Sequence, residues 1–150
     1  MIRTMELKDA KAIQKINKES LGYDFPEKET LEKLKVIRQL SNNRIFVYEK
    51  ENQVIGYIHL AEYENTYHKS LKNILTLAVR PKNQEQGVAS QLLEAGQNWA
   101  KNQGSEGIRL VTGFERENAQ KFYEKHGFQK RKDQTNYING GNDHLFYWPK

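Results

Sequence analysis

The feature that most constrains the fold is the run Ile74–Val79, ILTLAV, which is short, almost entirely apolar and followed at once by Arg80 and Pro81. Such a run, bounded by a proline, predicts a strand that is buried on both faces of a sheet. After a polar loop, Gly87 opens a longer segment whose apolar residues recur at helical spacing: Val88, Leu92, Leu93, Trp99 and Ala100. A central strand that leads into an amphipathic helix predicts a layered α/β domain.

The remaining segments show strand and helix patterns in turn. We expect a strand over Ile2–Met5, helices over 9–21 and 26–40, and a hairpin over 44–63 that turns at Lys50–Gln53. A strand over Ile108–Thr112, a helix over 117–127 and a hairpin around the NGGN turn at 139–142 complete the series. The order β-α-α-β-β-β-α-β-α-β-β predicts a mixed α/β fold, in a single domain over residues 1–150.

The composition limits which cellular compartment and which kinds of site we expect. The chain has 150 residues and no cysteine, which excludes disulfides, thiolate zinc sites and a cysteine nucleophile. No pair among the four histidines has close ligand spacing, so we expect no metal. No stretch resembles a signal peptide or approaches a membrane span of about 18 apolar residues. We therefore expect a cytoplasmic protein without a membrane partner.

The charge of the chain is modestly positive. Its 24 basic and 19 acidic residues give a net charge of +5, and the two signs are mixed along the sequence. Mixed charge is typical of a solvated surface, and no nucleic-acid-binding motif is present, so we expect no nucleic-acid partner. A positive balance also suits a small anionic ligand.

The loop Gln84–Ala89, QEQGVA, joins the central strand to the helix. Open α/β sheets bind ligands beyond the carboxyl ends of their strands, and a helix N-terminus offers unpaired N–H groups to an anion. Gly87 would allow close approach of a pyrophosphate, but it could equally serve only to shape a turn. The loop matches neither the Walker phosphate loop nor the dinucleotide GxGxxG motif.

The segment LAVRPKNQEQGVASQLL resembles the acetyl-coenzyme A signature of the GNAT superfamily of N-acetyltransferases, Arg/Gln-x-x-Gly-x-Gly/Ala, at Gln84, Gly87 and Ala89. A second segment, ENAQKFYEKHGF, resembles the later motif of that family. The resemblance covers essentially the whole chain. It implies a mostly antiparallel sheet that is splayed at the cofactor site and flanked by about four helices.

The resemblance also implies how acetyl-coenzyme A would be held. Main-chain N–H groups of the signature loop would bind the pyrophosphate, and the pantetheine arm would pair with the backbone of the preceding strand like an added strand. The cofactor residues implied in this way are Leu77, Ala78, Val79, Gln84, Gln86, Gly87, Val88, Ala89 and Ser90. Asn118 is a weaker candidate, because the asparagine of many family members falls here on Arg116. Glu85 is an unexpected neighbour for a phosphate.

Tyr123 falls on the tyrosine that commonly protonates the departing thiolate in the family. A phenol O–H is chemically suited to that step, although Tyr123 could also be a packing aromatic, as we expect for Phe122. The attacking amine must be neutral, so a base is useful, and the sequence offers His59 or Glu62. A backbone N–H near Leu77 or Ala78 would meet the tetrahedral oxyanion.

The predicted function is therefore transfer of an acetyl group to a primary amine of a small molecule, peptide or protein. A catalytically weak sensor that binds acetyl-coenzyme A is the alternative. The sequence identifies neither the acceptor amine nor the oligomeric state, and it leaves a homodimer open.

Overall fold

The computed structural model describes residues 1–112, 117–131 and 137. Two compact units, Met1–Leu110 and Val111–Lys150, are described separately. Arg116 and most of the predicted hairpin around the NGGN turn lie outside the described residues. The expectation of a single domain over the whole chain stays a prediction.

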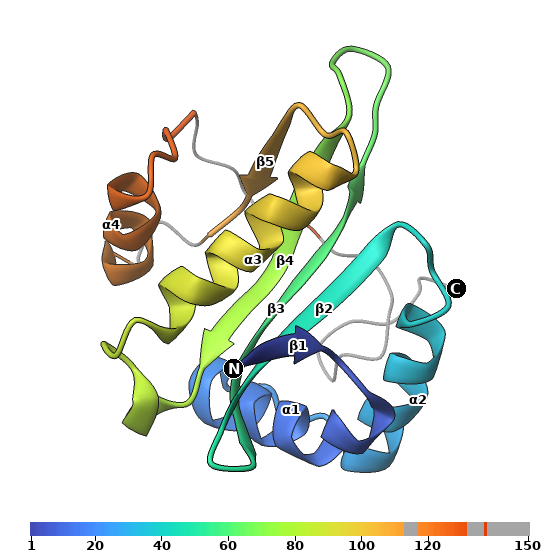
Figure 1. Cartoon of the computed structure of the whole chain (residues 1–150), viewed down its shortest axis with the longest axis vertical. Helices are drawn as coiled ribbons and strands as arrows, with labels where there is room; N and C mark the ends of the chain where they lie inside the picture. The colour runs from blue at the N-terminus through green and yellow to red at the C-terminus, as the bar shows by residue number, and fades with distance from the viewer. Residues whose placement is uncertain (113–116, 132–136, 138–150) are drawn as a thin grey trace. The chain divides into compact units, whose positions relative to one another are not determined.

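The first unit is built on a five-stranded sheet (Figure 1). Its strands are β1 (Ile2–Thr4), β2 (Asn43–Lys50), β3 (Gln53–Tyr63), β4 (Leu71–Val79) and β5 (Gly107–Leu110), and they lie side by side in chain order. The first three pairings are antiparallel, and only β4 and β5 run parallel. This confirms the expected mixed α/β fold with a mostly antiparallel sheet.

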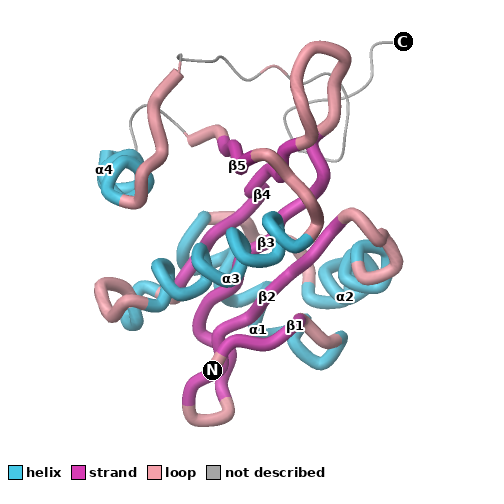
Figure 2. The backbone as a smooth tube through the Cα atoms, turned by 45° about the horizontal axis from the view of Figure 1, so that its top comes forward, coloured by secondary structure: helices cyan, strands magenta, loops and turns pink. Residues whose placement is uncertain are grey.

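Helices cover both faces of this sheet, as Figure 2 shows. The longest, α3 (Val88–Asn102), lies on one face, while α1 (Ala10–Ile16) and α2 (Glu27–Ile37) lie on the other. Two short 3-10 turns, η1 (Leu7–Asp9) and η3 (Pro81–Asn83), precede α1 and follow β4. The helix expected over 9–21 is divided, because α1 continues into a five-residue π-helix, η2 (Asn17–Leu21). The second unit contains α4 (Glu117–Lys125).

The core beneath α3 is tightly packed. Ile58 and Leu60 of β3 and Leu92 and Leu93 of α3 are almost completely buried. A Cβ on Gly96 would lie 3.1 Å from side-chain atoms of Ile58 and Leu60, so a glycine there lets α3 approach the sheet closely. The opposite face has its own core, in which Ile13, Ile16, Leu34, Val47 and Tyr57 belong to one buried cluster.

A bulge in β4 shapes the site. His59 pairs with Thr76 and Leu60 with Ile74, so Leu75 is an extra residue between the two pairs. On the other side, β5 pairs with β4 only over Leu71–Ile74. Within the described part of the chain, β4 therefore has an open edge from Leu75 to Val79, which is the expected splay.

Candidate active site

The open edge of β4 presents backbone groups of two of the predicted residues. Arg80 N–H donates to the Ile55 carbonyl at 2.8 Å. Because inward and outward groups alternate along an antiparallel strand, the amide and carbonyl of Ala78 point toward β3, and those of Leu77 and Val79 point toward the open edge. The structure thus brings Leu77 and Val79, rather than Ala78, to the edge where an extended ligand can pair.

The loop that follows ends at an uncapped helix. Gly87 is the N-cap of α3, with φ at 83°, and as a glycine it makes no side-chain capping hydrogen bond. Gln84, Gln86 and Gly87 are exposed, Ala89 and Ser90 are half-buried, and Val88 is buried, so Val88 can offer only its backbone. Glu85 is exposed and adopts a φ of 63°, in the left-handed region. The one acidic residue of the loop is thus exposed to solvent.

Side chains tie the start of the loop to the π-helical turn η2. The Val79 carbonyl accepts hydrogen bonds from Ser20 Oγ at 2.8 Å and from Gln84 Nε2 at 3.2 Å. Next to it, Arg80 donates two hydrogen bonds to the Glu19 carboxylate, each 3.3 Å long. The predicted residue Gln84 therefore has a structural partner, and sequence reasoning missed Ser20 and Glu19 because their partners are about sixty residues away.

His59 lies on the sheet face that carries α1 and α2. Its Nε2 is 2.8 Å from Asn43 Oδ1, and burial lowers the pKa of its imidazole to about 4. The ring is therefore neutral at physiological pH. A neutral ring that donates through Nε2 keeps a lone pair on Nδ1.

Glu62, the other candidate base, lies on the opposite face, beneath α3. Its Oε2 accepts a hydrogen bond from Lys72 Nζ at 2.9 Å, and the Lys72 ammonium lies 5.2 Å from the Trp99 ring centroid. The Lys72 side chain is only 1% exposed. The structure separates the two candidate bases, and it gives Glu62 the task of neutralising a buried cation.

A polar cluster that the sequence did not reveal joins η2 to the sheet. The Tyr57 hydroxyl donates to Asn17 Oδ1 of η2. Burial raises the pKa of Tyr57 to about 12, although its hydrogen bonds to Thr76 and Asn17 oppose the shift. Tyr57 is thus a neutral donor, and π-helical turns such as η2 are frequent at functional sites.

Tyr123 and Asn118 belong to the second unit and are described within it. Tyr123 is half-buried in α4 and makes edge-to-face contacts with Phe122 and Phe128, with ring centroids 5.2 and 5.4 Å apart. Asn118 is exposed in the first turn of the same helix. The aromatic contacts hold the Tyr123 ring, and its role in proton transfer stays a prediction.

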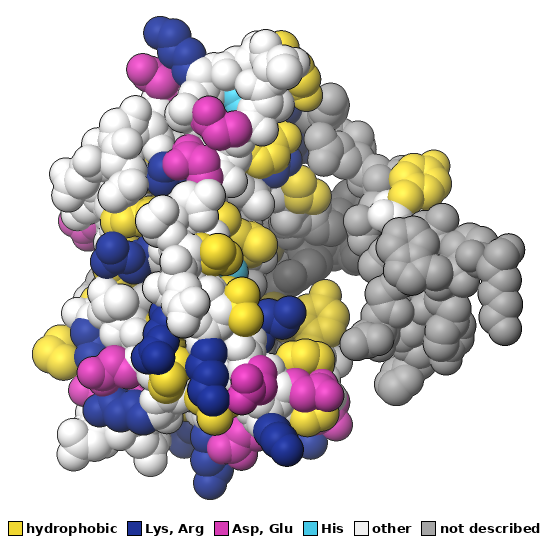
Figure 3. All heavy atoms as spheres, turned by 90° about the vertical axis from the view of Figure 1, so that its right-hand side faces the viewer, with side chains coloured by type: hydrophobic (Ala, Val, Ile, Leu, Met, Phe, Trp, Pro, Cys, Tyr) yellow, Lys and Arg dark blue, Asp and Glu magenta, His cyan; other side chains and the backbone are white. Residues whose placement is uncertain are grey.

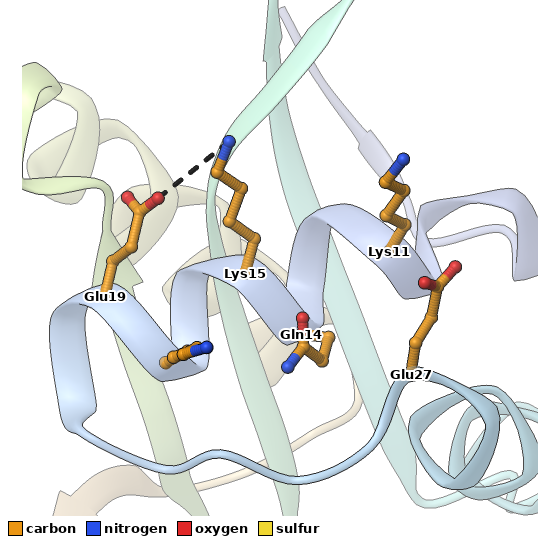
Figure 4. A pocket seen from close by; sticks show the side chains of 6 residues that line it. Lys11, Gln14, Lys15, Glu19 and Glu27 are labelled. Carbon is orange, nitrogen blue, oxygen red and sulfur yellow. Dashed lines mark ion pairs between the residues drawn. The ribbon is translucent and has the colours of Figure 1, made fainter.

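A hollow of the first unit lies elsewhere. A shallow groove of about 540 Å³ runs along the outer side of α1 and η2, lined by Lys11, Gln14, Lys15, Lys18, Glu19 and Glu27 (Figure 4). It contains none of the predicted site residues.

Among the described residues, no cluster of three or more His, Asp or Glu side chains could hold a metal ion. None of the helices described is both long and apolar enough to span a bilayer.

Comparison with known proteins gives a consistent result. Residues 41–130 match the family model of the acetyltransferase (GNAT) domain. No curated protein sequence matches the chain. Among solved structures, a transcriptional regulator from Bacillus halodurans has a TM-score of 0.83 at 20% identity, with 92% of this chain and 98% of that chain covered. At these identities, the likeness concerns the fold.

Two further structures are acetyltransferases by name. The aminoglycoside acetyltransferase AAC(6')-Iy, bound to a bisubstrate analogue of coenzyme A and acetylneamine, has a TM-score of 0.81 at 23% identity over 94% of this chain and 98% of that one. A GNAT family acetyltransferase from Staphylococcus aureus has a TM-score of 0.77 at 18% identity, covering 92% and 97% of the two chains.

Proposed function

Because this chain belongs to the GNAT acetyltransferase family, we propose that it transfers the acetyl group of acetyl-coenzyme A to an amine nitrogen of a small molecule or peptide. One observation carries the proposal: the open edge of β4 leads directly to the uncapped N-terminus of α3. An extended amide-containing arm fits the first, and a pyrophosphate fits the second.

The residues that would hold the cofactor offer mainly backbone groups. Leu77 and the amide of Val79 would pair with the pantetheine arm, since the Val79 carbonyl is already bonded to Ser20 and Gln84. The N–H groups that follow Gly87 would bind the pyrophosphate. A Cβ built on Gly87 meets no atom within 4 Å, so the space in front of this backbone is open to a ligand.

The chemistry is a direct displacement. The neutral amine attacks the thioester carbonyl carbon, a bond from nitrogen to carbon forms, and the carbon–sulfur bond breaks. The nitrogen loses a proton, and the departing thiolate gains one, for which Tyr123 is our candidate donor. A backbone N–H on the open edge of β4 would stabilise the oxyanion.

Between the two candidate bases we favour His59. Its imidazole is neutral, with a pKa of about 4 because of burial, so a ring nitrogen can accept a hydrogen bond from an amine and pass its proton toward solvent. Glu62 is held by Lys72 on the face that α3 covers. A base of such low pKa is weak, which implies that the acceptor amine arrives already neutral.

The first experiment is a thermal shift with acetyl-coenzyme A, followed by thiol release over a panel of amines. Binding should raise Tm by mass action, and turnover should release free coenzyme A. A shift without release for any amine would favour the sensor. If millimolar ligand produced neither a Tm shift nor coenzyme A release, both the enzyme and the sensor hypotheses would be refuted. Replacement of Tyr123 by Phe should reduce kcat more than acetyl-coenzyme A affinity.

A further inference from the structure

The face of the sheet that carries α1 and α2 is only partly covered by them. The buried cluster on that face takes in Ile45, Val47, Tyr57 and Ala78, all toward one end of the sheet. Beyond it, half-buried residues alternate onto the same face: Asn43, His59, Ala61, Tyr63, Leu71, Asn73, Thr76 and Arg109. We call this set the upper face. It contains one formal charge, that of Arg109, and no acidic side chain.

Arg109 is held in a fixed orientation on the upper face. Its Nη1 donates to Asn73 Oδ1 at 2.7 Å, and its guanidinium carbon lies 4.2 Å from the centroid of the Tyr63 ring. The Tyr63 ring in turn stacks on His68, with centroids 5.4 Å apart. Three elements, β3, β4 and β5, therefore restrain one planar cation, and its other N–H groups form a fork that suits a carboxylate.

Arg109 differs in its partners from Arg3, Lys72 and Arg80. It shares with Arg44, which lies over the Phe46 and Trp99 rings on the other face of the sheet, the lack of an ion pair among the described residues. Arg3 pairs with Asp9 and Glu49, Lys72 with Glu62, and Arg80 with Glu19. Over the α1 and α2 layer, basic and acidic side chains are interspersed in the same way (Figure 3). Among the described residues, Arg109 forms no ion pair, although it is as firmly placed as those that do.

The position of Arg109 relates it to the bulge. Asn73, which pairs in register with Arg109, lies two residues before Leu75, where β4 separates from β5. At the rise of a strand, this spacing is about 7 Å. An acceptor whose amine reaches the bulge can therefore place a second group on the guanidinium, if a few bonds separate the two groups.

We propose that Arg109 selects the acceptor, and that this acceptor is an amine bearing a carboxylate a few bonds away, such as an ω-amino acid or a short peptide. The inference rests on the proposed function, because it assumes that the acceptor lies against the upper face. It also separates this chain from an enzyme for polycationic amines, since the upper face offers no carboxylate to a second ammonium group. Arg109 is then a specificity-determining residue, and Asn73 and Tyr63 position it.

The test compares ω-amino carboxylates with neutral amides and diamines of the same chain length. For the wild-type protein, kcat/KM should be about tenfold higher for the carboxylate than for the amide, as expected for one charge-assisted hydrogen-bonded pair. Arg109→Gln should abolish that preference by lowering kcat/KM for the carboxylate to about that for the amide. Arg109→Lys should keep part of it. Arg38→Gln, at an exposed site at the end of α2, should keep all of it.

A binding experiment tests the same preference without turnover, and it does not depend on Arg109→Gln. With coenzyme A present, the amino carboxylate should raise the Tm of the wild-type protein and of Arg109→Lys more than the matched amide does. Equal shifts, or a preference for diamines in either experiment, would overturn the inference. If acetyl-coenzyme A is bound and consumed in those cases, the proposed function survives. If it is neither bound nor consumed, the proposed function fails on its own result.

Discussion

Gly87 matters in two ways, through its backbone conformation and through the space that it leaves for a ligand. Its φ of 83° lies in the left-handed region, which strains any residue with a Cβ, and the space in front of it is open. Gly104 near the other end of α3 has nearly the same geometry, with a φ of 79° and no atom near an added Cβ. Substitution of either glycine would introduce the same backbone strain, but only Gly87 is expected to lie at the ligand. Comparing the two variants therefore separates strain from ligand contact.

We predict that Gly87→Ala weakens acetyl-coenzyme A binding by tenfold or more, while Gly104→Ala leaves it unchanged. Each variant should lose about 1 kcal/mol of unfolding free energy, because alanine is strained at positive φ. Calorimetric titration with acetyl-coenzyme A and urea unfolding measure the two effects. Equal affinities for the two variants would remove Gly87 from the cofactor site.

His59 supports a prediction about pH. Burial lowers the pKa of its imidazole from 6.5 to about 4, so the unfolded chain binds this proton more readily than the folded one. The stability contributed by the neutral ring is present above pH 6.5 and is lost as the pH falls from there to about 4. His59→Gln should therefore reduce the loss of unfolding free energy across this window, measured by urea titration at each pH. A parallel dependence in both proteins would contradict the assigned shift.

At the scale of elements, the Glu62–Lys72 ion pair links β3 to β4. The two residues face each other in register, and two residue pairs separate them from the bulge at Leu75. Glu62 Oε1 and Trp99 Nε1 are buried and have no hydrogen-bond partner within the described part of the chain. Removing one member of such a pair leaves a buried charge, whereas removing both does not.

We predict that Lys72→Met lowers the unfolding free energy by about 3 kcal/mol, and that Lys72→Met combined with Glu62→Met restores most of it. Because Lys72 lies three residues along β4 from the bulge at Leu75, the single variant should also weaken acetyl-coenzyme A binding. Replacement of Lys35, whose ion pair with Glu32 is exposed on α2, should change stability by less than 1 kcal/mol. Losses that simply add in the double variant would show that the two charges are not coupled.

The same elements show how far the sequence predicts the fold and the site. The apolar run Ile74–Val79 lies in β4 and the helix after Gly87 is α3, as their patterns predict. The expected burial of that run on both faces is wrong at Leu75, which is 53% exposed at the bulge. The bulge at Leu75 and the buried Lys72 leave no such pattern, since both depend on pairing with β3. Likewise, Ser20 and Arg109 acquire partners only when distant segments meet. Local spacing predicts which backbone groups would hold the cofactor, and this stays a prediction. Tertiary contacts determine the side chains around those groups.

At the scale of the whole molecule, the net charge of +5 and the proposed backbone cradle act over different distances. Backbone N–H groups act only at contact. The excess of basic side chains, in contrast, attracts a polyanionic ligand from beyond contact, and salt screens that attraction over about 10 Å at 0.1 M. Coenzyme A carries phosphates at one end and an uncharged pantetheine arm at the other, so the two contributions can be measured separately.

We predict that the affinity for acetyl-coenzyme A falls about tenfold as the salt concentration rises from about 0.05 to 0.5 M, mainly through a slower association rate. An acetylated pantetheine without phosphates should bind more weakly but show no such dependence, because it reports only the pairing along β4. Stopped-flow binding across the salt series gives both rates. If the loss appears in dissociation alone, charged side chains would be holding the phosphates directly, and the backbone cradle after Gly87 would not be the principal anchor.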